Sequence, residues 1–327
     1  MAAGFAILGA GAMGSIIAAH LARAGHEVVV LARGRRADQV KSDGLQIRGL
    51  ADFGTSIRVL TDPGRLRRAD VLIVAMKALA TSAALEPLRG AEIGAALSVQ
   101  NGVMKNKLLG EAFGRERTLG ALANISGELT PSGEVVFTRN VEVLVGSLAH
   151  AASGRAEEVA AALDGSGLPS RAVADIESQE WSKFTAWVAL MAVGVVTRMN
   201  TWRFLTDPDA ALILVRLVRE MARLAEALNF KLNDESVLPV AALRHGPEQH
   251  AVAGLRELGE RYRIQAPEHR LSTVQDLLAG RPLEVAETIG FAIQTAESLQ
   301  LSLPLLDAAY RIVSAIDPAR QALARPA

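Results

Sequence analysis

Lys183 is the residue whose surroundings in the sequence most directly suggest proton transfer. It stands near the start of a very apolar segment, 179–199, that is predicted to form a helix. Burial disfavours a charged amine and lowers its pKa, which makes proton donation easier. Glu284 opens another predicted helix, 283–299, where a carboxylate also stabilises the helix dipole without any catalytic role. Spacing alone does not pair the two residues.

Two loops carry further polar side chains that could meet a substrate or a cofactor. Lys77 follows the predicted strand 71–75, and Asn101 follows the predicted strand 95–99. The carboxyl ends of parallel strands form the usual ligand crevice of a doubly wound sheet. Lys77 could contact a phosphate or a substrate carboxylate, and Asn101 could bind a ribose or a substrate oxygen. The alternatives are a surface cation and an ordinary Asn-Gly turn.

A glycine-rich turn near the amino terminus predicts a dinucleotide site. Gly9, Gly11 and Gly14 form a G-x-G-x-x-G motif between an apolar strand and a helix that begins near Met13. In this motif the first glycine permits a sharp turn, the second leaves space for pyrophosphate, and the third lets the helix pack on the sheet. The amide groups of the first helical turn, at Met13, then face the phosphates. The alternative is that the glycines serve only a tight turn.

The second strand, 27–31, indicates which dinucleotide would bind. NAD-selective sites usually place an acidic residue at the end of this strand, whereas a 2′-phosphate requires cations. Here Arg33 follows the strand, and no carboxylate comes before Asp38. The planar guanidinium of Arg33 can stack on adenine and pair with a phosphate, and Arg35 and Arg36 add charge. The sequence therefore predicts NADP(H) as the cofactor, with a solvated basic loop as the alternative.

Length and periodicity predict two domains. A chain of 327 residues exceeds what one hydrophobic core usually supports. Strands alternate with helices at first, which predicts a Rossmann-like α/β domain, a mostly parallel, doubly wound sheet, over residues 1–175. In residues 176–327 the apolar residues recur with the period of an α-helix, so this part is predicted to form an all-α domain that binds the substrate and carries catalytic residues. The helices predicted there span 179–199, 209–228, 252–262, 272–278, 283–299 and 303–316.

Composition argues against several classes of protein. The 35 Lys and Arg residues balance the 35 Asp and Glu residues, so nothing indicates a nucleic acid as partner. The most apolar stretch, 187–196, is too short to span a bilayer, so no membrane partner is expected. The 6 histidines lack metal-ligand spacing, so no metal is predicted.

Two further expectations concern location and assembly. The chain has no cysteine, and its first strand begins too early to leave room for a signal peptide. Both features favour a cytoplasmic protein. The apolar stripe of segment 210–228 favours a homodimer, because it exceeds what one small domain needs.

Taken together, these motifs resemble the ketopantoate reductases, also called 2-dehydropantoate 2-reductases. The resemblance covers nearly the whole chain and is carried by the motif Gly9 to Gly14, Arg33, Lys77, Gln100-Asn101-Gly102, Trp181-Ser182-Lys183, Ser272, Gln275-Asp276, Gly280-Arg281 and Glu284. It implies the NADPH-dependent reduction of a 2-oxo acid to a 2-hydroxy acid, a step of pantothenate biosynthesis. The arginine matching Arg33 favours NADPH in this family.

The resemblance also implies a role for each matching residue of the site. Lys183 matches the general acid that protonates the carbonyl oxygen while hydride arrives from NADPH. Glu284 matches a glutamate that binds the hydroxyl side of the substrate, and Ser272 matches a serine that contacts its carboxylate. Asn101 and Lys77 match residues that line the cofactor and substrate crevice. These roles suit the chemistry, because hydride addition builds negative charge on the carbonyl oxygen.

The helix face beside Lys183 departs from the family pattern. Family members usually carry asparagines one and two turns beyond the lysine, whereas this chain has Trp187 and Met191. Loss of these amides would weaken the binding of a polar substrate by about 1–3 kcal/mol for each group left unpaired. Trp187 and Met191 therefore predict a substrate-binding wall suited to a bulkier or more apolar 2-oxo compound, with ketopantoate still the leading substrate.

Two other functions remain open at this point. One is a dehydrogenase or imine-type reductase of the same fold that acts with NADP on another compound, which Lys183 and Glu284 do not exclude. The other is a non-catalytic NADP-binding sensor, against which the set of Lys183, Ser272 and Glu284 argues.

Overall fold

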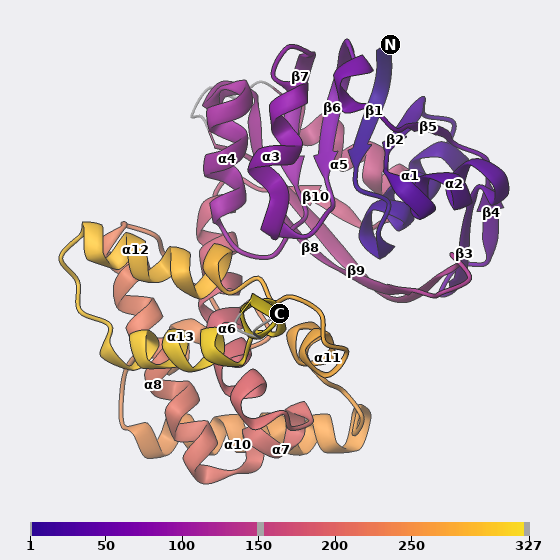
Figure 1. Ribbon diagram of the computed structural model, residues 1–327. Coiled ribbons are helices and arrows are strands. Elements are labelled where there is room, and N and C mark those ends of the chain that lie inside the picture. Colours follow the sequence, from indigo (N-terminus) through magenta and orange to yellow (C-terminus); the bar gives the residue numbers. More distant parts are fainter. Residues whose placement is uncertain (1, 149–153, 324–327) are drawn as a thin grey trace. The chain divides into compact units, whose positions relative to one another are not determined.

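The computed structural model describes residues 2–148 and 154–323 and divides into two compact units between Glu180 and Trp181 (Figure 1). We call them the N-terminal unit and the C-terminal unit. The division falls a little beyond position 175, where the sequence placed it. The reason lies in the first turn of helix α6, Ile176–Thr197, whose Ile176 is buried against Leu122 and Leu144 of the N-terminal unit.

The N-terminal unit is built on one 10-stranded sheet. Its order is β4-β3-β9-β8-β7-β6-β1-β2-β5, with β10 beside β9. Strands β5, β2, β1, β6, β7 and β8 are parallel, whereas β8 with β9 and β3 with β4 are antiparallel. The strands are β1 Ala2–Leu8, β2 Val28–Leu31, β3 Leu45–Gly49, β4 Phe53–Thr55, β5 Arg58–Leu60, β6 Arg68–Val74, β7 Glu92–Ser98, β8 Thr118–Leu129, β9 Val135–Ser147 and β10 Ser170–Ala172.

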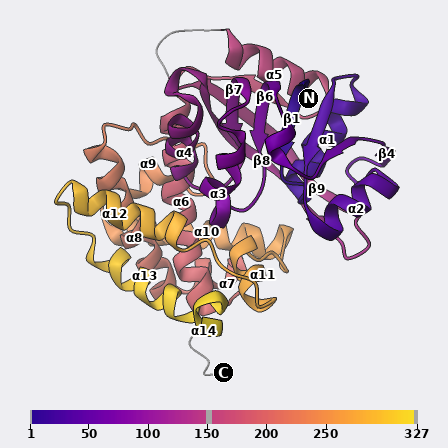
Figure 2. The ribbon, with the colours of Figure 1, turned by 45° about the horizontal axis from the view of Figure 1, so that its top comes forward.

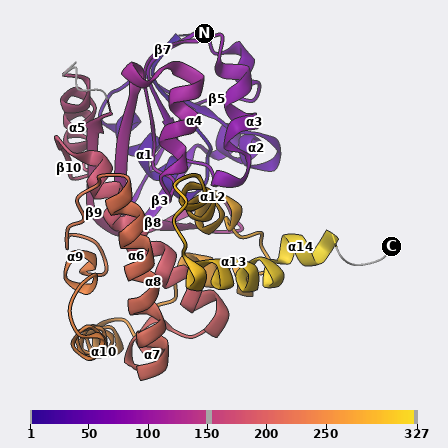
Figure 3. The same cartoon turned by 90° about the vertical axis from the view of Figure 1, so that its left-hand side faces the viewer.

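Helices cover both faces of this sheet, which confirms the predicted doubly wound α/β fold (Figure 3). Alternate residues of β1 point to opposite faces: Ile7 joins a core with α1, α2 and α5, whereas Leu8 joins a core with α3 and α4. The helices are α1 Ala12–Arg23, α2 Gly34–Asp43, α3 Thr81–Leu85, α4 Met104–Phe113 and α5 Arg155–Gly165. Short 3₁₀ turns are η1 Pro63–Arg65, η2 Ala78–Ala80, η3 Glu86–Leu88 and η4 Arg115–Arg117.

The described residues of the C-terminal unit form helices and loops only, as predicted (Figure 2). Helix α8 is central, because it contacts α7, α9, α10, α12 and α13. The side chain of Asp207 accepts hydrogen bonds from the first amides of α8 and so fixes where this helix begins. Besides α6, the helices are α7 Thr201–Thr206, α8 Pro208–Ala227, α9 Val240–Leu243, α10 Glu248–Gln265, α11 Ser272–Leu278, α12 Phe291–Ser298, α13 Pro304–Ile316 and α14 Pro318–Leu323, with the π-helical turn η5 at Ala286–Gly290.

Within the described ranges, each helix is too short or too polar to cross a bilayer.

His20 is a titratable group inside the core of the N-terminal unit. Its Nδ1 donates a hydrogen bond to the carbonyl oxygen of Ile16 at 2.8 Å. The imidazole meets the rings of Phe53 and Phe137 edge-on, with centroids 5.1 and 5.5 Å away. Burial lowers the pKa of His20, so the neutral ring is the form that suits the fold.

We expect acid to destabilise the N-terminal unit through His20. The folded pKa lies below the ordinary value, so the unfolded chain binds the proton more readily. The contribution is therefore fully present above about pH 6.5 and is lost as the pH falls toward the folded pKa. Thermal unfolding should show a falling midpoint over this range. His20→Phe should show a smaller pH dependence, and an equal dependence in both proteins would contradict the assignment.

Candidate active site

The glycine-rich turn lies between β1 and α1 and has the geometry that the motif predicts. Gly9 has a φ of +107°, and a Cβ there would lie 2.9 Å from the backbone nitrogen of Met76. A Cβ on Gly14 would lie only 1.9 Å from the carbonyl oxygen of Gly9. A Cβ on Gly11, by contrast, would meet no atom within 4 Å. The first and third glycines are thus required by packing, and Gly11 faces open space.

The start of α1 fits an anionic group. Gly11 is the residue before this helix and offers no side chain to cap it, and Met13 lies in the first helical turn. The amides of a first turn have no partner within their own helix, and the helix dipole adds positive potential there. These features suit the pyrophosphate of a dinucleotide.

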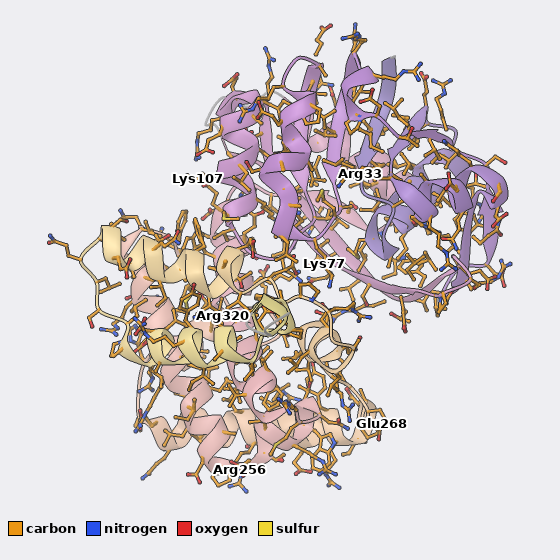
Figure 4. All side chains as sticks on the ribbon, viewed as in Figure 1. Arg33, Lys77, Lys107, Arg256, Glu268 and Arg320 are labelled. Carbon is orange, nitrogen blue, oxygen red and sulfur yellow. The ribbon has the colours of Figure 1, made fainter. Side chains whose placement is uncertain are left out.

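The arginines of the basic segment after β2 differ in their surroundings. Arg33 lies two residues beyond the end of β2, directly before α2, and is exposed (Figure 4). Arg36 lies inside α2 and holds the glycine-rich turn: its Nε donates to the carbonyl oxygen of Ala10 at 2.8 Å, and its Nη2 donates to Ser15 Oγ at 2.9 Å. Its Nη1 donates to the carbonyl oxygen of Gly133 at 2.8 Å. Burial lowers the pKa of Arg36, but a guanidinium stays charged in proteins.

This arrangement revises the prediction for the segment. The sequence favoured Arg35 or Arg36 as additional charge for the 2′-phosphate, with a solvated basic loop as the alternative. The residues instead belong to helix α2, which begins at Gly34. All three nitrogens of Arg36 donate to the protein, so the structure gives this side chain a role in bracing the glycine-rich turn.

Lys77 and Asn101 lie in the loops that follow adjacent parallel strands. Lys77 comes just after β6 and is exposed (Figure 4), and Asn101 comes just after β7 and is partly buried. Because β1 also pairs with β6 in parallel, both loops lie at the same edge of the sheet as the glycine-rich turn. The structure therefore brings these predicted residues of the N-terminal unit to one edge.

Gln100, which the sequence offered only as part of the Gln100-Asn101-Gly102 triplet and without a role, joins the two loops. Its Nε2 donates to the carbonyl oxygen of Met76 and to Thr81 Oγ1, both at 2.8 Å. Its Oε1 accepts from Ser98 Oγ at 2.9 Å. The buried side-chain amide of Gln100, the residue before Asn101, is thereby bonded to Met76, the residue before Lys77.

In the C-terminal unit, the backbone around Lys183 is firmly held. Lys183 is partly buried, between the fully buried Ser182 and the buried Phe184. The ring of Trp181 stacks on Phe230 with centroids 5.1 Å apart. Ser182 Oγ accepts a hydrogen bond from the backbone nitrogen of Asn233 at 2.9 Å. The direction in which the Lys183 side chain leaves α6 is therefore set by packing on its neighbours.

The residues one and two turns beyond Lys183 differ in exposure. Trp187 is partly exposed, whereas Met191 is fully buried. The hydroxyl of Thr288 lies 3.8 Å from the sulfur of Met191 and also donates to the carbonyl oxygen of Glu284. Met191 thus links α6 to the segment that carries Glu284, and its burial gives it a packing role in this unit.

The helix that the sequence predicts over 283–299 is formed only from residue 286 onward, as η5 and α12, so Glu284 does not open it. Glu284 precedes a π-helical turn, η5, in which the amide of Gly290 donates to the carbonyl oxygen of Val285 at 2.9 Å. The Thr288 hydroxyl bonds the carbonyl oxygen of Glu284 and so competes with the regular helical pattern. Such turns occur frequently at functional sites. Glu284 itself is partly buried.

Ser272 begins α11 and is exposed. Helix α11 packs on α6 at Gly194, where a Cβ would lie 2.8 Å from Leu271 and 3.2 Å from Val274. The segments that carry Ser272 and Glu284 therefore both contact the helix that carries Lys183.

No group of three or more His, Cys, Asp or Glu side chains in the described residues is arranged to hold a metal ion. His150, one of the histidines considered in the sequence, lies outside the described residues.

We expect two glycines of one motif to respond differently to the same substitution. Gly14→Ala forces a methyl group into the Gly9 carbonyl and should destabilise the unit by about 3 kcal/mol. Gly11→Ala should change stability by no more than about 1 kcal/mol but should weaken NADPH binding at least about tenfold, because its methyl group fills open space beside the first turn of α1. Chemical denaturation and nucleotide titration measure the two effects. Unchanged nucleotide binding in Gly11→Ala would refute the placement of the phosphates.

Comparison with known proteins agrees with this architecture. Residues 5–150 match the family model described as ketopantoate reductase PanE/ApbA, and residues 175–317 match the model for the C-terminal part of the same family. The 2-dehydropantoate 2-reductase of Archaeoglobus fulgidus is 28% identical over 291 residues, which are 89% of this chain and 90% of that protein. The enzyme of the same name from Pyrococcus horikoshii is 25% identical over 301 residues, 91% of this chain and 92% of the other.

Solved structures share the fold at lower identity. A PanE/ApbA family ketopantoate reductase from Ralstonia eutropha has a TM-score of 0.81 and 23% identity, over 98% of this chain and 100% of that one. D-mandelate dehydrogenase, solved with NADH and anilino(oxo)acetate, has a TM-score of 0.82 and 18% identity, over 98% of this chain and 100% of that one. The two family models together span most of the sequence, and this chain belongs to the ketopantoate reductase PanE/ApbA family.

Proposed function

We propose that this protein reduces 2-dehydropantoate to the corresponding 2-hydroxy acid with NADPH. The observation that carries the proposal is the match of both units to one reductase family, which makes the chain an oxidoreductase that acts on CH-OH groups. Relatives named 2-dehydropantoate 2-reductase align over nine tenths of the chain and support this substrate over the bulkier 2-oxo acid that the sequence left open.

The N-terminal unit would hold the nucleotide. Gly9, Gly11, Met13 and Gly14 would cradle the pyrophosphate at the start of α1, where Gly11 leaves open space. Arg33, exposed at the end of β2, would pair with the 2′-phosphate and so favour NADPH over NADH. Lys77 and Asn101 would line the nicotinamide end, and the bound cofactor would supply the hydride.

The C-terminal unit would supply the residues for the substrate. The ammonium group of Lys183 would donate a proton to the carbonyl oxygen of the 2-oxo acid as the carbonyl carbon gains hydride, and the products would be an alcohol and a neutral amine. Glu284 would accept a hydrogen bond from the substrate hydroxyl, and Ser272 would donate one to the substrate carboxylate. Trp187 would line the substrate, whereas the buried Met191 would shape that wall from inside the unit.

A role in pantothenate biosynthesis, a cytoplasmic location and a homodimer follow from the resemblance and the sequence and stay predictions.

Loss of NADPH absorbance with 2-dehydropantoate tests the function directly. The purified protein should oxidise NADPH only when the substrate is present. Lys183→Ala should lower kcat by about 10²- to 10⁴-fold, because a positioned general acid contributes that much to a rate. Lys107→Ala is the matched control: this lysine is exposed in α4 near Glu111 and should leave kcat unchanged. Full activity of Lys183→Ala would overturn the assigned role, and an inactive parent protein would overturn the proposed function.

Cofactor preference has its own test at Arg33. Arg33→Ser removes the guanidinium and should raise KM for NADPH about 10- to 100-fold, the range that corresponds to one charge-assisted hydrogen bond. KM for NADH should stay the same, because NADH lacks the 2′-phosphate. Lys41→Ser, which removes an exposed cation from the last turn of α2, is the comparison and should leave both KM values unchanged. An equal rise in KM for NADPH and NADH would show that Arg33 does not bind the 2′-phosphate.

A further inference from the structure

A buried ion pair lies in the N-terminal unit close to the loop that carries Asn101. Lys105 Nζ and Glu180 Oε1 are 3.1 Å apart, and the two side chains are only 5% and 3% exposed. Lys105 belongs to the first turn of α4, and Glu180 lies one turn before Lys183 in α6. The reductase roles assigned above leave this pair unused.

Every charged group of this pair is satisfied. Lys105 Nζ donates to the carbonyl oxygen of Gln100 at 3.1 Å and to that of Ala121 at 2.5 Å, in addition to Glu180. Glu180 Oε1 also accepts from the backbone nitrogen of Ala121 at 3.0 Å. Glu180 Oε2 accepts from Asn106 Nδ2 at 2.5 Å. The ammonium group thus uses all its donors, as a buried cation requires.

Stability alone is a weak reason for such a pair. Removing two charges from water is costly, and replacing a buried ion pair by apolar side chains is often neutral or stabilising. What the charges do provide is direction, because three of the bonds hold particular backbone atoms: the carbonyl oxygen of Gln100, and the carbonyl oxygen and the nitrogen of Ala121 in β8. The other two bonds join the side chain of Glu180 in α6 to those of Lys105 and Asn106 in α4.

These contacts extend a network that already joins two loops of the site. The side chain of Gln100 holds the carbonyl oxygen of Met76, next to Lys77, and its backbone oxygen accepts from Lys105. Lys105 in turn holds Glu180. The hydrogen bonds therefore form a chain from Met76 through Gln100 and Lys105 to Glu180. Glu180 belongs to α6, the helix that also carries Lys183.

We propose that Lys105 and Glu180 are positioning residues for hydride transfer: they fix the Asn101 loop and the turn of α6 that precedes Lys183. The proposal rests on the reductase function proposed above. Neither side chain needs to touch substrate or cofactor, and both act through residues that do. Misplacement by about 1 Å, through a change far from the chemistry, can lower a rate about 100-fold.

Single substitutions with a matched control test this role. Glu180→Gln and Lys105→Met remove one charge each and should lower kcat about 10- to 100-fold, with a smaller change in KM. Glu220→Gln is the control, because Glu220 is also buried and also accepts from backbone amides, those of Leu305 and Leu306 at 3.1 and 2.8 Å. It should lower the melting temperature but leave kcat unchanged.

The isotope effect distinguishes positioning from loss of structure. With NADPH deuterated at the transferred position, poorly aligned hydride transfer becomes slower and more rate-limiting, so the isotope effect on kcat should rise in Glu180→Gln and not in Glu220→Gln. A folded Glu180→Gln protein with the parent kcat and the parent isotope effect would overturn the proposal.

A double variant covers the case in which a single variant fails to fold. Lys105→Met combined with Glu180→Leu leaves no unpaired buried charge, so it should fold better than either single variant. Folded protein with a kcat at least about tenfold reduced supports positioning. Folded protein with the parent kcat refutes it.

Nucleotide titration separates this proposal from the proposed function. If the parent protein binds NADPH but reduces no 2-oxo acid, the reductase function fails. In that case, weaker NADPH binding in Glu180→Gln, without a change in Glu220→Gln, would still support the positioning of the Asn101 loop, and equal binding in both variants would refute it.

Discussion

The parallel alignment of β1, β6 and β7 is the constraint on which the N-terminal unit depends. It brings the ends of three strands that are far apart in sequence to one edge, where the glycine-rich turn and the loops of Lys77 and Asn101 follow. Backbone there is packed closely, since even a methyl group on Gly9 would meet Met76 at 2.9 Å. Hydrogen bonds then hold these segments in place. Gln100 joins the Lys77 loop to the Asn101 loop, and Arg36 donates to the carbonyl oxygen of Ala10 in the glycine-rich turn.

Local signals in the sequence predicted much of this architecture. The glycine-rich turn was predictable because its three glycines follow a fixed spacing within one short segment between a strand and a helix, and α11 occupies 272–278 as its periodicity indicated. The Arg36 contact with Gly133 spans 97 positions, and that of Glu180 with Ala121 spans 59. Contacts of such separation leave no periodic trace, so sequence reasoning missed both the contacts that Arg36 makes with the glycine-rich turn and the separate network of Gln100, Lys105 and Glu180. The π-helical turn was also missed, and it too has a distant contact: the hydroxyl of Thr288, which donates to the carbonyl oxygen of Glu284, lies beside the sulfur of Met191, 97 positions away.

The C-terminal unit organises its polar residues around α6. One face of this helix carries Lys183, Trp187 and Met191, and helix α11 and the η5 segment pack on α6 at Gly194 and Met191. A helix that is apolar over most of its length suits a position inside a bundle. The partly buried Lys183 is therefore held on a rigid element, which is how precise functional sites are usually built.

The pairing of β3 with β9 has a consequence for how the chain is made. Strand β3, Leu45–Gly49, finds its parallel neighbour only at Val135–Phe137, so the β3–β4 hairpin leaves the ribosome long before its partner exists. Two-stranded hairpins are marginally stable alone, and distant pairings slow folding. Most of the N-terminal unit must therefore be synthesised before its sheet is complete. During that interval the edge of β3 is open to other chains, which makes it the segment of this unit where early misfolding is expected to begin.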